Sequence, residues 1–310
     1  MLGLAVGDAL GAPVEFLRLE QIHEQYGPEG LADLVGWGGF PAGYYTDDTQ
    51  MSVATARGLI RARREFGERF EAHICAAVYG EYLKWLGTQD DPRERRAPGH
   101  TCLSELKRGT GGTIANPIND SKGCGGVMRT APVGLACSSE RAFLIGAECA
   151  ALTHGHESAY WPAGFLSELI SRLIAGEELQ KAVEITRETL VLHEGHEETL
   201  NRVNAALELS QRGTSETAAI EELGRGWTGE EALAISLFCA LRFPGDWSAA
   251  TLAAVNHSGD SDSTGSICGG ILGACLGCDA IPPRWLERLE HRGMLQTVAD
   301  DLLSTFSVRT

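Results

Sequence analysis

The sequence predicts an all-α fold formed by one compact domain. Apolar residues recur at three- and four-residue intervals in most segments, which is the spacing of an amphipathic helix. No run of alternating β-branched residues is present, so we expect no β-sheet. The chain has 310 residues, 43% of them hydrophobic, and can therefore bury a substantial core. No internal repeat or Pro/Ser/Gly-rich linker divides it, and the predicted domain spans residues 1–310.

The helical spacing predicts the main elements in chain order, and a small-residue stretch after the second acidic cluster predicts one more helix. The predicted helices cover residues 50–64, 70–86, 140–152, 159–175, 179–192, 230–241, 252–257, 265–274 and 283–291. The small residues of 265–274 allow that helix to lie very close to a neighbour. Thr228-Gly-Glu-Glu231 has the form of a capping box before the helix at 230–241.

Three stretches between these helices are predicted to be irregular. Residues 35–45 and 89–127 are rich in Gly, Pro and Asn, and residues 212–229 form the most polar interruption. Long irregular segments of this kind commonly carry binding residues.

Composition excludes several classes of function. The formal net charge of −16 argues against nonspecific binding to nucleic acid. Most of the nine cysteines lie in apolar segments, which predicts buried thiols in a reducing compartment. Asp8 and Pro13 interrupt the first apolar stretch, so we expect no signal peptide, and no apolar run reaches membrane-spanning length. These features predict a cytoplasmic protein that binds neither nucleic acid nor membrane.

Two acidic clusters carry the strongest chemical signal. The first is Thr-Asp-Asp-Thr at residues 46–49, and the second is Gly-Asp-Ser-Asp-Ser-Thr at residues 259–264. Helix capping explains either cluster taken singly. Four carboxylates brought together would repel one another unless cations lay between them, and oxygen ligands favour Mg²⁺, Mn²⁺ or Ca²⁺. The coincidence of two clusters favours a two-metal hydrolytic site. The second cluster also resembles the start of an EF-hand calcium loop, but Ile271 stands where such a loop requires a glutamate, so that alternative fails.

Other motifs are weaker when taken singly. The glycine-rich loop at 121–128 lacks the ending of a P-loop, but its backbone N–H groups can bind a pyrophosphate. His154 follows a predicted helix in a region of small residues. His193 and His196 end another helix and are predicted to be surface side chains.

Taken in order, the motifs resemble those of the ADP-ribosylglycohydrolase family, which includes dinitrogenase-reductase-activating glycohydrolase and ADP-ribosylarginine hydrolase. The matching segments are residues 3–11 followed by Glu15, then 45–50, 123–129, 153–154 and 259–265. The likeness covers roughly residues 3 to 275, and five ordered motifs are far more specific than one.

The resemblance implies an all-α domain of orthogonal helices with a binuclear Mg²⁺ site, or Mn²⁺, in a central cleft. The metal ligands that it implies are Thr46, Asp47, Asp48, Asp260, Asp262 and Ser263. The substrate-binding residues that it implies are Ser121, Gly123, Gly125, Gly126 and His154. Glu15 matches a mobile acidic residue near the scissile bond. Glu15, Asp47 and Asp48 are the candidates to deprotonate water, and the sequence does not choose among them.

The activity implied is hydrolysis of the N-glycosidic bond between ADP-ribose and an arginine of a modified protein. Ser263 within its hexad is most similar to the arginine-specific branch. Three alternatives stay open: a hydrolase of O-linked ADP-ribose (serine-linked, poly(ADP-ribose) or O-acetyl-ADP-ribose), a non-catalytic ADP-ribose binder, and an unrelated two-metal phosphohydrolase. We expect a monomer.

Two departures from the family pattern accompany the resemblance. Met1 lies two residues before the first motif, which predicts a shortened first helix. Cys124 stands where many relatives have Asn, so contacts at the phosphate loop are expected to differ.

Overall fold

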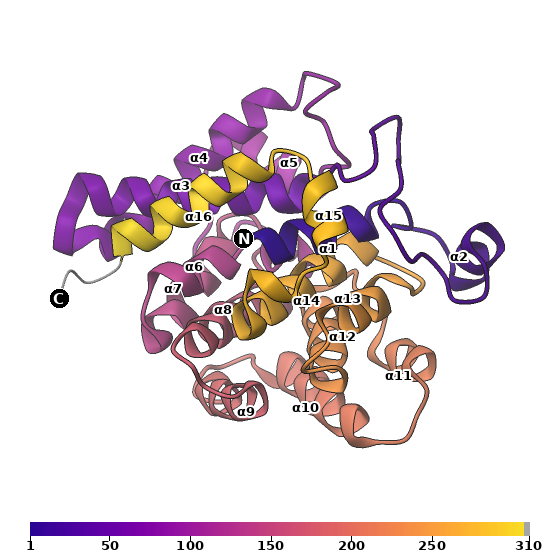
Figure 1. Cartoon of the computed structure of the whole chain (residues 1–310). Coiled ribbons are helices and arrows are strands. Elements are labelled where there is room, and N and C mark those ends of the chain that lie inside the picture. The colour runs from indigo at the N-terminus through magenta and orange to yellow at the C-terminus, as the bar shows by residue number, and fades with distance from the viewer. Residues whose placement is uncertain (307–310) are drawn as a thin grey trace.

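Two helices from opposite ends of the chain pack side by side at the centre of the molecule: α1 (Leu2–Gly11) and α14 (Ser261–Leu276) (Figure 1). The computed structural model describes residues 1–306, and residues 307–310 of the predicted domain lie outside them. A Cβ atom on Gly7 would lie 2.0 Å from the Gly265 carbonyl oxygen, so only glycine permits this approach. The predicted close packing of the small-residue helix is confirmed, and its partner is α1.

The other elements are also helical, and the described residues contain no strand. They are α2 (Leu19–Tyr26), α3 (Asp47–Phe66), η1 (Gly67–His73), α4 (Ile74–Thr88), α5 (His100–Arg108), η2 (Cys124–Gly126), α6 (Ala131–Ala136), α7 (Ser139–Ala151), α8 (Glu157–Ile174), α9 (Leu179–Leu190), α10 (Glu197–Gln211), α11 (Glu216–Leu223), α12 (Gly229–Arg242), α13 (Trp247–Val255), η3 (Cys278–Ala280), α15 (Pro283–Arg288) and α16 (Arg292–Phe306).

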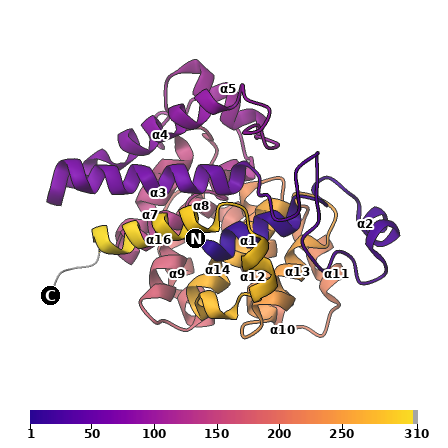
Figure 2. The ribbon, with the colours of Figure 1, turned by 45° about the horizontal axis from the view of Figure 1, so that its top comes forward.

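These helices surround a single core. The long helix α3 packs between α4 and α16 at one edge of the molecule (Figure 2). Helix α8 contacts α7, α12 and α14, and α14 also contacts α13. The buried apolar side chains from all these helices form one continuous cluster. The prediction of one all-α domain is therefore confirmed.

Two of the predicted loops contain helices. Helix α5 lies inside 89–127, where its buried side chains include Cys102 and Leu106 and its end is marked by left-handed Gly109. Helix α11 lies inside 212–229, where the Ser215 hydroxyl accepts a hydrogen bond from the Ala218 N–H. The loop prediction was wrong there because short amphipathic helices flanked by glycines carry too few apolar repeats to stand out.

Other helix boundaries also differ from the predictions. Helix α13 begins earlier than residue 252, because the Asp246 carboxylate accepts a hydrogen bond from the Ala249 N–H and starts the helix there. Helices α2, α10 and α16 were not predicted. The Thr228 side chain makes no capping hydrogen bond, so the predicted capping box is wrong. His193 is not a simple surface residue, because its ring stacks on Phe143 with centroids 4.9 Å apart.

The cysteines and the helix lengths bear on two further predictions. All nine cysteines are free thiols, and six are buried: Cys102, Cys124, Cys137, Cys149, Cys239 and Cys268. Cys275 and Cys278 do not form a disulfide. Among the helices that the structure describes, none combines the length and the apolar character needed to cross a membrane.

Candidate active site

The two acidic clusters meet in one cavity of about 180 Å³. Nine of the predicted site residues line it: Glu15, Asp47, Asp48, Gly123, Gly125, His154, Asp260, Asp262 and Ser263. Three other predicted residues do not line it: Thr46, Ser121 and Gly126. The cavity thus brings together the start of α3, the start of α14, the glycine-rich loop and the loop that follows α1.

A buried carboxylate positions the first cluster. Asp8, on α1, accepts hydrogen bonds from the Thr46 N–H at 2.8 Å and the Thr49 N–H at 2.9 Å. It also accepts one from the Thr49 hydroxyl at 2.6 Å. Burial raises the pKa of Asp8 to about 6, although these hydrogen bonds act in the opposite direction. Asp8 therefore holds the first turn of α3 against α1.

The loop before α5 fixes Asp47 from the other side. The Asp47 N–H donates to the Arg96 carbonyl oxygen at 3.1 Å, and the Asp47 carboxylate accepts from the Gly99 N–H at 3.2 Å. Arg96 is itself buried, and its guanidinium forms an ion pair with Glu290. Thr46 caps α3, its hydroxyl accepting from the Asp48 N–H at 3.3 Å. Thr46 acts as a helix cap in this structure, so its predicted role as a metal ligand stays a prediction.

The second cluster is held by backbone contacts and by the buried Thr264 hydroxyl, which lies 2.7 Å from the Ala254 carbonyl oxygen and 2.9 Å from that of Asp260. Asp260 occupies the cap position of α14, but its side chain makes no capping hydrogen bond. Its N–H donates to the Arg225 carbonyl oxygen at 2.9 Å, and its carboxylate accepts from the Cys124 thiol at 2.9 Å. Helix capping therefore does not account for the Asp260 side chain, which is left to face the cavity.

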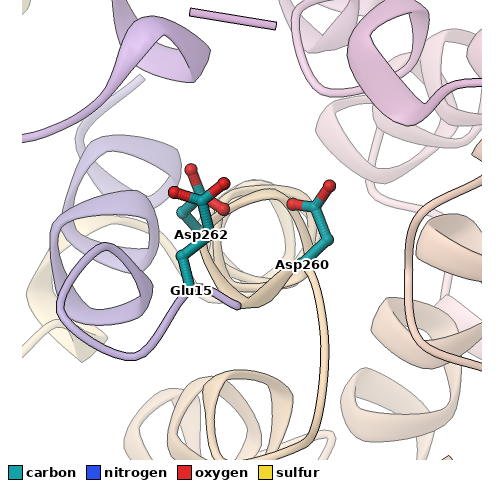
Figure 3. Close-up of side chains that lie close together, drawn as sticks. All are labelled: Glu15, Asp260 and Asp262. Carbon is teal, nitrogen blue, oxygen red and sulfur yellow. The ribbon is translucent and has the colours of Figure 1, made fainter. Parts of the chain in front are cut away.

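Glu15, Asp260 and Asp262 converge as a carboxylate group (Figure 3). One ligand atom from each lies within 4.8 Å of the others, which is a spacing that can hold a metal ion. Burial, followed by the charge of Asp260, raises the pKa of Glu15 to about 9. Burial likewise raises the pKa of Asp47 to about 8, and those of Asp48 and Asp262 well above the usual range for aspartate. Carboxylates packed this closely favour a bound positive charge.

Two orphaned oxygen atoms test whether a cation fits. Among the described residues, Asp48 Oδ2 and Asp262 Oδ1 are buried and have no hydrogen-bond partner. An unpaired buried acceptor is costly, and coordination of a hard cation would satisfy it. The donor set of carboxylates and hydroxyls is the type that Mg²⁺ and Mn²⁺ prefer. The residues present therefore fit the predicted metal.

The glycine-rich loop forms another wall. The Cys124 N–H donates to the Trp227 carbonyl oxygen at 3.1 Å, and the Gly229 N–H donates to the Lys122 carbonyl oxygen at 2.8 Å. This short ladder ties the loop to the start of α12. The Ser121 hydroxyl accepts from the Gly123 N–H at 3.3 Å, so Ser121 shapes the loop from outside the cavity.

His154 is a buried, neutral side chain at the cavity wall. The Arg129 guanidinium donates to the Thr153 hydroxyl oxygen at 2.7 Å, and the Thr153 hydroxyl in turn forms a hydrogen bond with His154 Nδ1 at 2.8 Å. Nε2, the other ring nitrogen, is left without a protein partner among the hydrogen bonds that the described residues form in this network. Burial, together with the charge of Arg129, lowers the pKa of His154 to about 3. A Cβ atom on Gly125 would lie 3.1 Å from Nε2, which places this nitrogen beside the glycine-rich loop.

Sequence reasoning missed several residues of the site, of which three matter most for its geometry. Asp8 was visible only as a polar residue inside an apolar helix, a pattern that often marks a buried network. Trp227 lines the cavity from a segment predicted to be a loop. Cys124 was noted as a departure from the family pattern, but its contact with Asp260 could not be read from the sequence.

Comparisons with known proteins identify the family of the chain. The family model described as ADP-ribosylglycohydrolase matches residues 1–310. The chain is 30% identical to the ADP-ribosyl-[dinitrogen reductase] glycohydrolase of Rhodospirillum rubrum, over 94% of this chain and 89% of that one. It is 24% identical to the ADP-ribosylarginine hydrolase Tri1 of Serratia proteamaculans, over 97% and 77% of the two chains. A solved structure titled "ADP-ribosylglycohydrolase-related protein complex" aligns over 99% of this chain and 96% of that chain, with a TM-score of 0.74 and 28% identity. The chain belongs to the ADP-ribosylglycohydrolase family and is a hydrolase of ADP-ribosyl linkages.

Proposed function

We propose that this protein hydrolyses the N-glycosidic bond between ADP-ribose and an arginine side chain of a modified protein. The observation that carries the proposal is the meeting of both acidic clusters with the glycine-rich loop in one cavity. Two further points favour arginine. The hexad containing Ser263 resembles the arginine-specific branch, and the relative Tri1 is named as an ADP-ribosylarginine hydrolase.

In this proposal the residues of the two clusters would hold two Mg²⁺ ions, or Mn²⁺ ions in their place. The ligands proposed are Thr46, Asp47, Asp48, Asp260, Asp262 and Ser263, and the geometry adds Glu15 as a further candidate. Such ions supply Lewis-acid polarisation and a water of lowered pKa when they are bound.

The remaining residues orient the substrate and move protons. The loop at 121–128 presents backbone N–H groups to the phosphates, and His154 Nε2 forms a hydrogen bond with the substrate. One of Glu15, Asp47 and Asp48 takes a proton from the attacking water. The water oxygen bonds to C1″ as the C1″–N bond breaks, and the proton ends on the departing guanidine nitrogen. The transition state is expected to resemble an oxocarbenium ion.

One assay tests the linkage and the need for metal together. Purified protein is offered ADP-ribosyl-arginine and ADP-ribosyl-serine peptides with Mg²⁺, then with EDTA, then with Mg²⁺ restored. We expect release of ADP-ribose from the arginine peptide, loss of release with EDTA and recovery with Mg²⁺.

Each other outcome selects a different function. Cleavage of the serine peptide alone would select an O-linked substrate. Tight binding of ADP-ribose without cleavage of either peptide would select a non-catalytic binder. Full activity in EDTA would contradict the metal site.

The monomeric state and the cytoplasmic location stay predictions.

A further inference from the structure

Two exposed aromatic rings stand at the edge of the cavity. In the part of the chain that the structure describes, the Phe16 side chain is 64% exposed and that of Trp227 is 40% exposed. Their rings stack on each other with centroids 5.3 Å apart and an angle of 10° between planes. Trp227 also lines the cavity that contains Glu15 and Asp260. A stacked pair left exposed beside a site is a surface for another planar group.

The backbone holds this pair in place. The Phe16 N–H donates to the Gly259 carbonyl oxygen at 3.0 Å, and the Trp227 carbonyl oxygen accepts from the Cys124 N–H at 3.1 Å. Phe16 adopts a φ of 65°, in the left-handed region that a phenylalanine rarely occupies. Such strain persists only where surrounding contacts enforce it, and it clusters at functional sites. The backbone at Phe16 is thus fixed to the second acidic cluster, and the backbone at Trp227 to the glycine-rich loop.

We propose that Phe16 and Trp227 form a platform that stacks the guanidinium of the ADP-ribosylated arginine and thereby selects an arginine linkage. This inference depends on the proposed function. The position of the two rings favours the leaving group of the reaction as the group that stacks on them. Phe16 directly follows Glu15, and Glu15 lies beside the carboxylates of Asp260 and Asp262. A guanidinium is planar, charged and weakly hydrated, and it stacks well on tryptophan. A serine linkage offers no planar group, so it gains nothing from the platform.

The test compares Trp227→Leu, Trp227→Phe and Phe16→Leu with the unaltered protein on the arginine and serine peptides. For Trp227→Leu we expect kcat/KM on the arginine peptide to fall about 3- to 30-fold, mainly through KM, because stacking is a binding interaction. In Phe16→Leu the kcat/KM on the arginine peptide should also fall, and Trp227→Phe should retain most of the activity. Any slow cleavage of the serine peptide and the affinity for free ADP-ribose, measured by calorimetry, should change less than about twofold.

Phe66→Leu is the matched control, because Phe66 is 37% exposed and stacks on His73 away from the cavity. Thermal unfolding checks that each variant is folded, and Phe16→Leu carries the test if Trp227→Leu unfolds. Equal losses on both peptides, or a matching loss of affinity for free ADP-ribose, would show that the rings bind adenine or ribose and would overturn the platform. Unchanged kinetics on the arginine peptide in both leucine variants would overturn the platform but leave the proposed function standing. An unaltered protein that cleaves only the serine peptide would instead overturn the proposed function and the platform with it.

Discussion

The starts of α3 and α14 present similar acidic sequences to the same cavity, but different forces hold them there. At the start of α3, buried polar groups position the turn: the Asp8 carboxylate binds Thr46 and Thr49. At the start of α14, the glycine contact in which Gly7 meets Gly265 positions the helix, and the Thr264 hydroxyl adds hydrogen bonding at this turn. Carboxylates at both helix starts gain from the helix dipole, which is the one feature they share locally.

This difference shows that a similar motif can depend on distinct parts of the fold. The first cluster depends on a few hydrogen bonds in a region without solvent, where each lost bond leaves a donor or an acceptor unpaired. The second depends on two backbones approaching closely, where added volume is the threat. Helix α1 serves both, because Asp8 and Gly7 are neighbours on it.

The largest effect is expected from removing charge in either cluster. Asp47→Asn with Asp48→Asn should lower the release of ADP-ribose by about 10³-fold or more, because the cation site would lose its charged ligands. Asp260→Asn with Asp262→Asn should cause a loss of similar size. Circular dichroism should show that both double variants stay folded. Near-normal turnover in the first double variant would contradict the metal site, and a large loss in only one variant would show that the clusters are not equivalent.

The glycine contact that positions the second cluster should be sensitive to added side-chain volume, and the quantity affected should be the stability of the fold. In Gly265→Ala the new Cβ would lie 2.5 Å from the Gly7 carbonyl oxygen, so the two helices must move apart. We expect the free energy of unfolding to fall by about 2 to 3 kcal/mol. Urea denaturation measures this change.

Gly270→Ala is the matched control on the same helix, because its nearest atom would be Leu4 Cβ at 3.6 Å. Alanine is the better helix former, so this variant should be unchanged or more stable by up to about 1 kcal/mol. Equal destabilisation of the two variants would contradict the role assigned to the α1–α14 contact.

The smallest effect is expected from one hydrogen bond at the first cluster. Thr49→Val keeps the side-chain volume but removes the hydroxyl that donates to Asp8 at 2.6 Å. A hydrogen bond to a charged group contributes about 1.5 kcal/mol or more, so the free energy of unfolding should fall by about that amount. Mn²⁺ titration should also show weaker binding, because the turn carrying Asp47 and Asp48 is held less firmly.

Thr297→Val, on an exposed face of α16, serves as the control and should change stability by less than about 0.5 kcal/mol. If Thr49→Val kept both its stability and its Mn²⁺ affinity, the network around Asp8 would not be what holds the first cluster.

Much of this picture could be predicted from the chain alone. Apolar spacing predicted the all-α class, and small residues after Asp262 predicted a closely packed helix. Ordered motifs predicted the family and most of the cavity lining. Spacing did less well where helices were short and polar, as in α5 and α11, because such elements gain their stability from tertiary contacts.

The sequence by itself determined which chemical groups are present: two groups of carboxylates, a glycine-rich loop and a histidine, each at or near a helix end. Only the tertiary structure decided how they act together. It left Thr46 and Ser121 out of the cavity lining, brought Glu15 to the carboxylates of α14 and paired His154 with Thr153. The physical reason is that burial, unpaired oxygens and ring stacking depend on neighbours distant in the chain, and no local pattern records which neighbours those are.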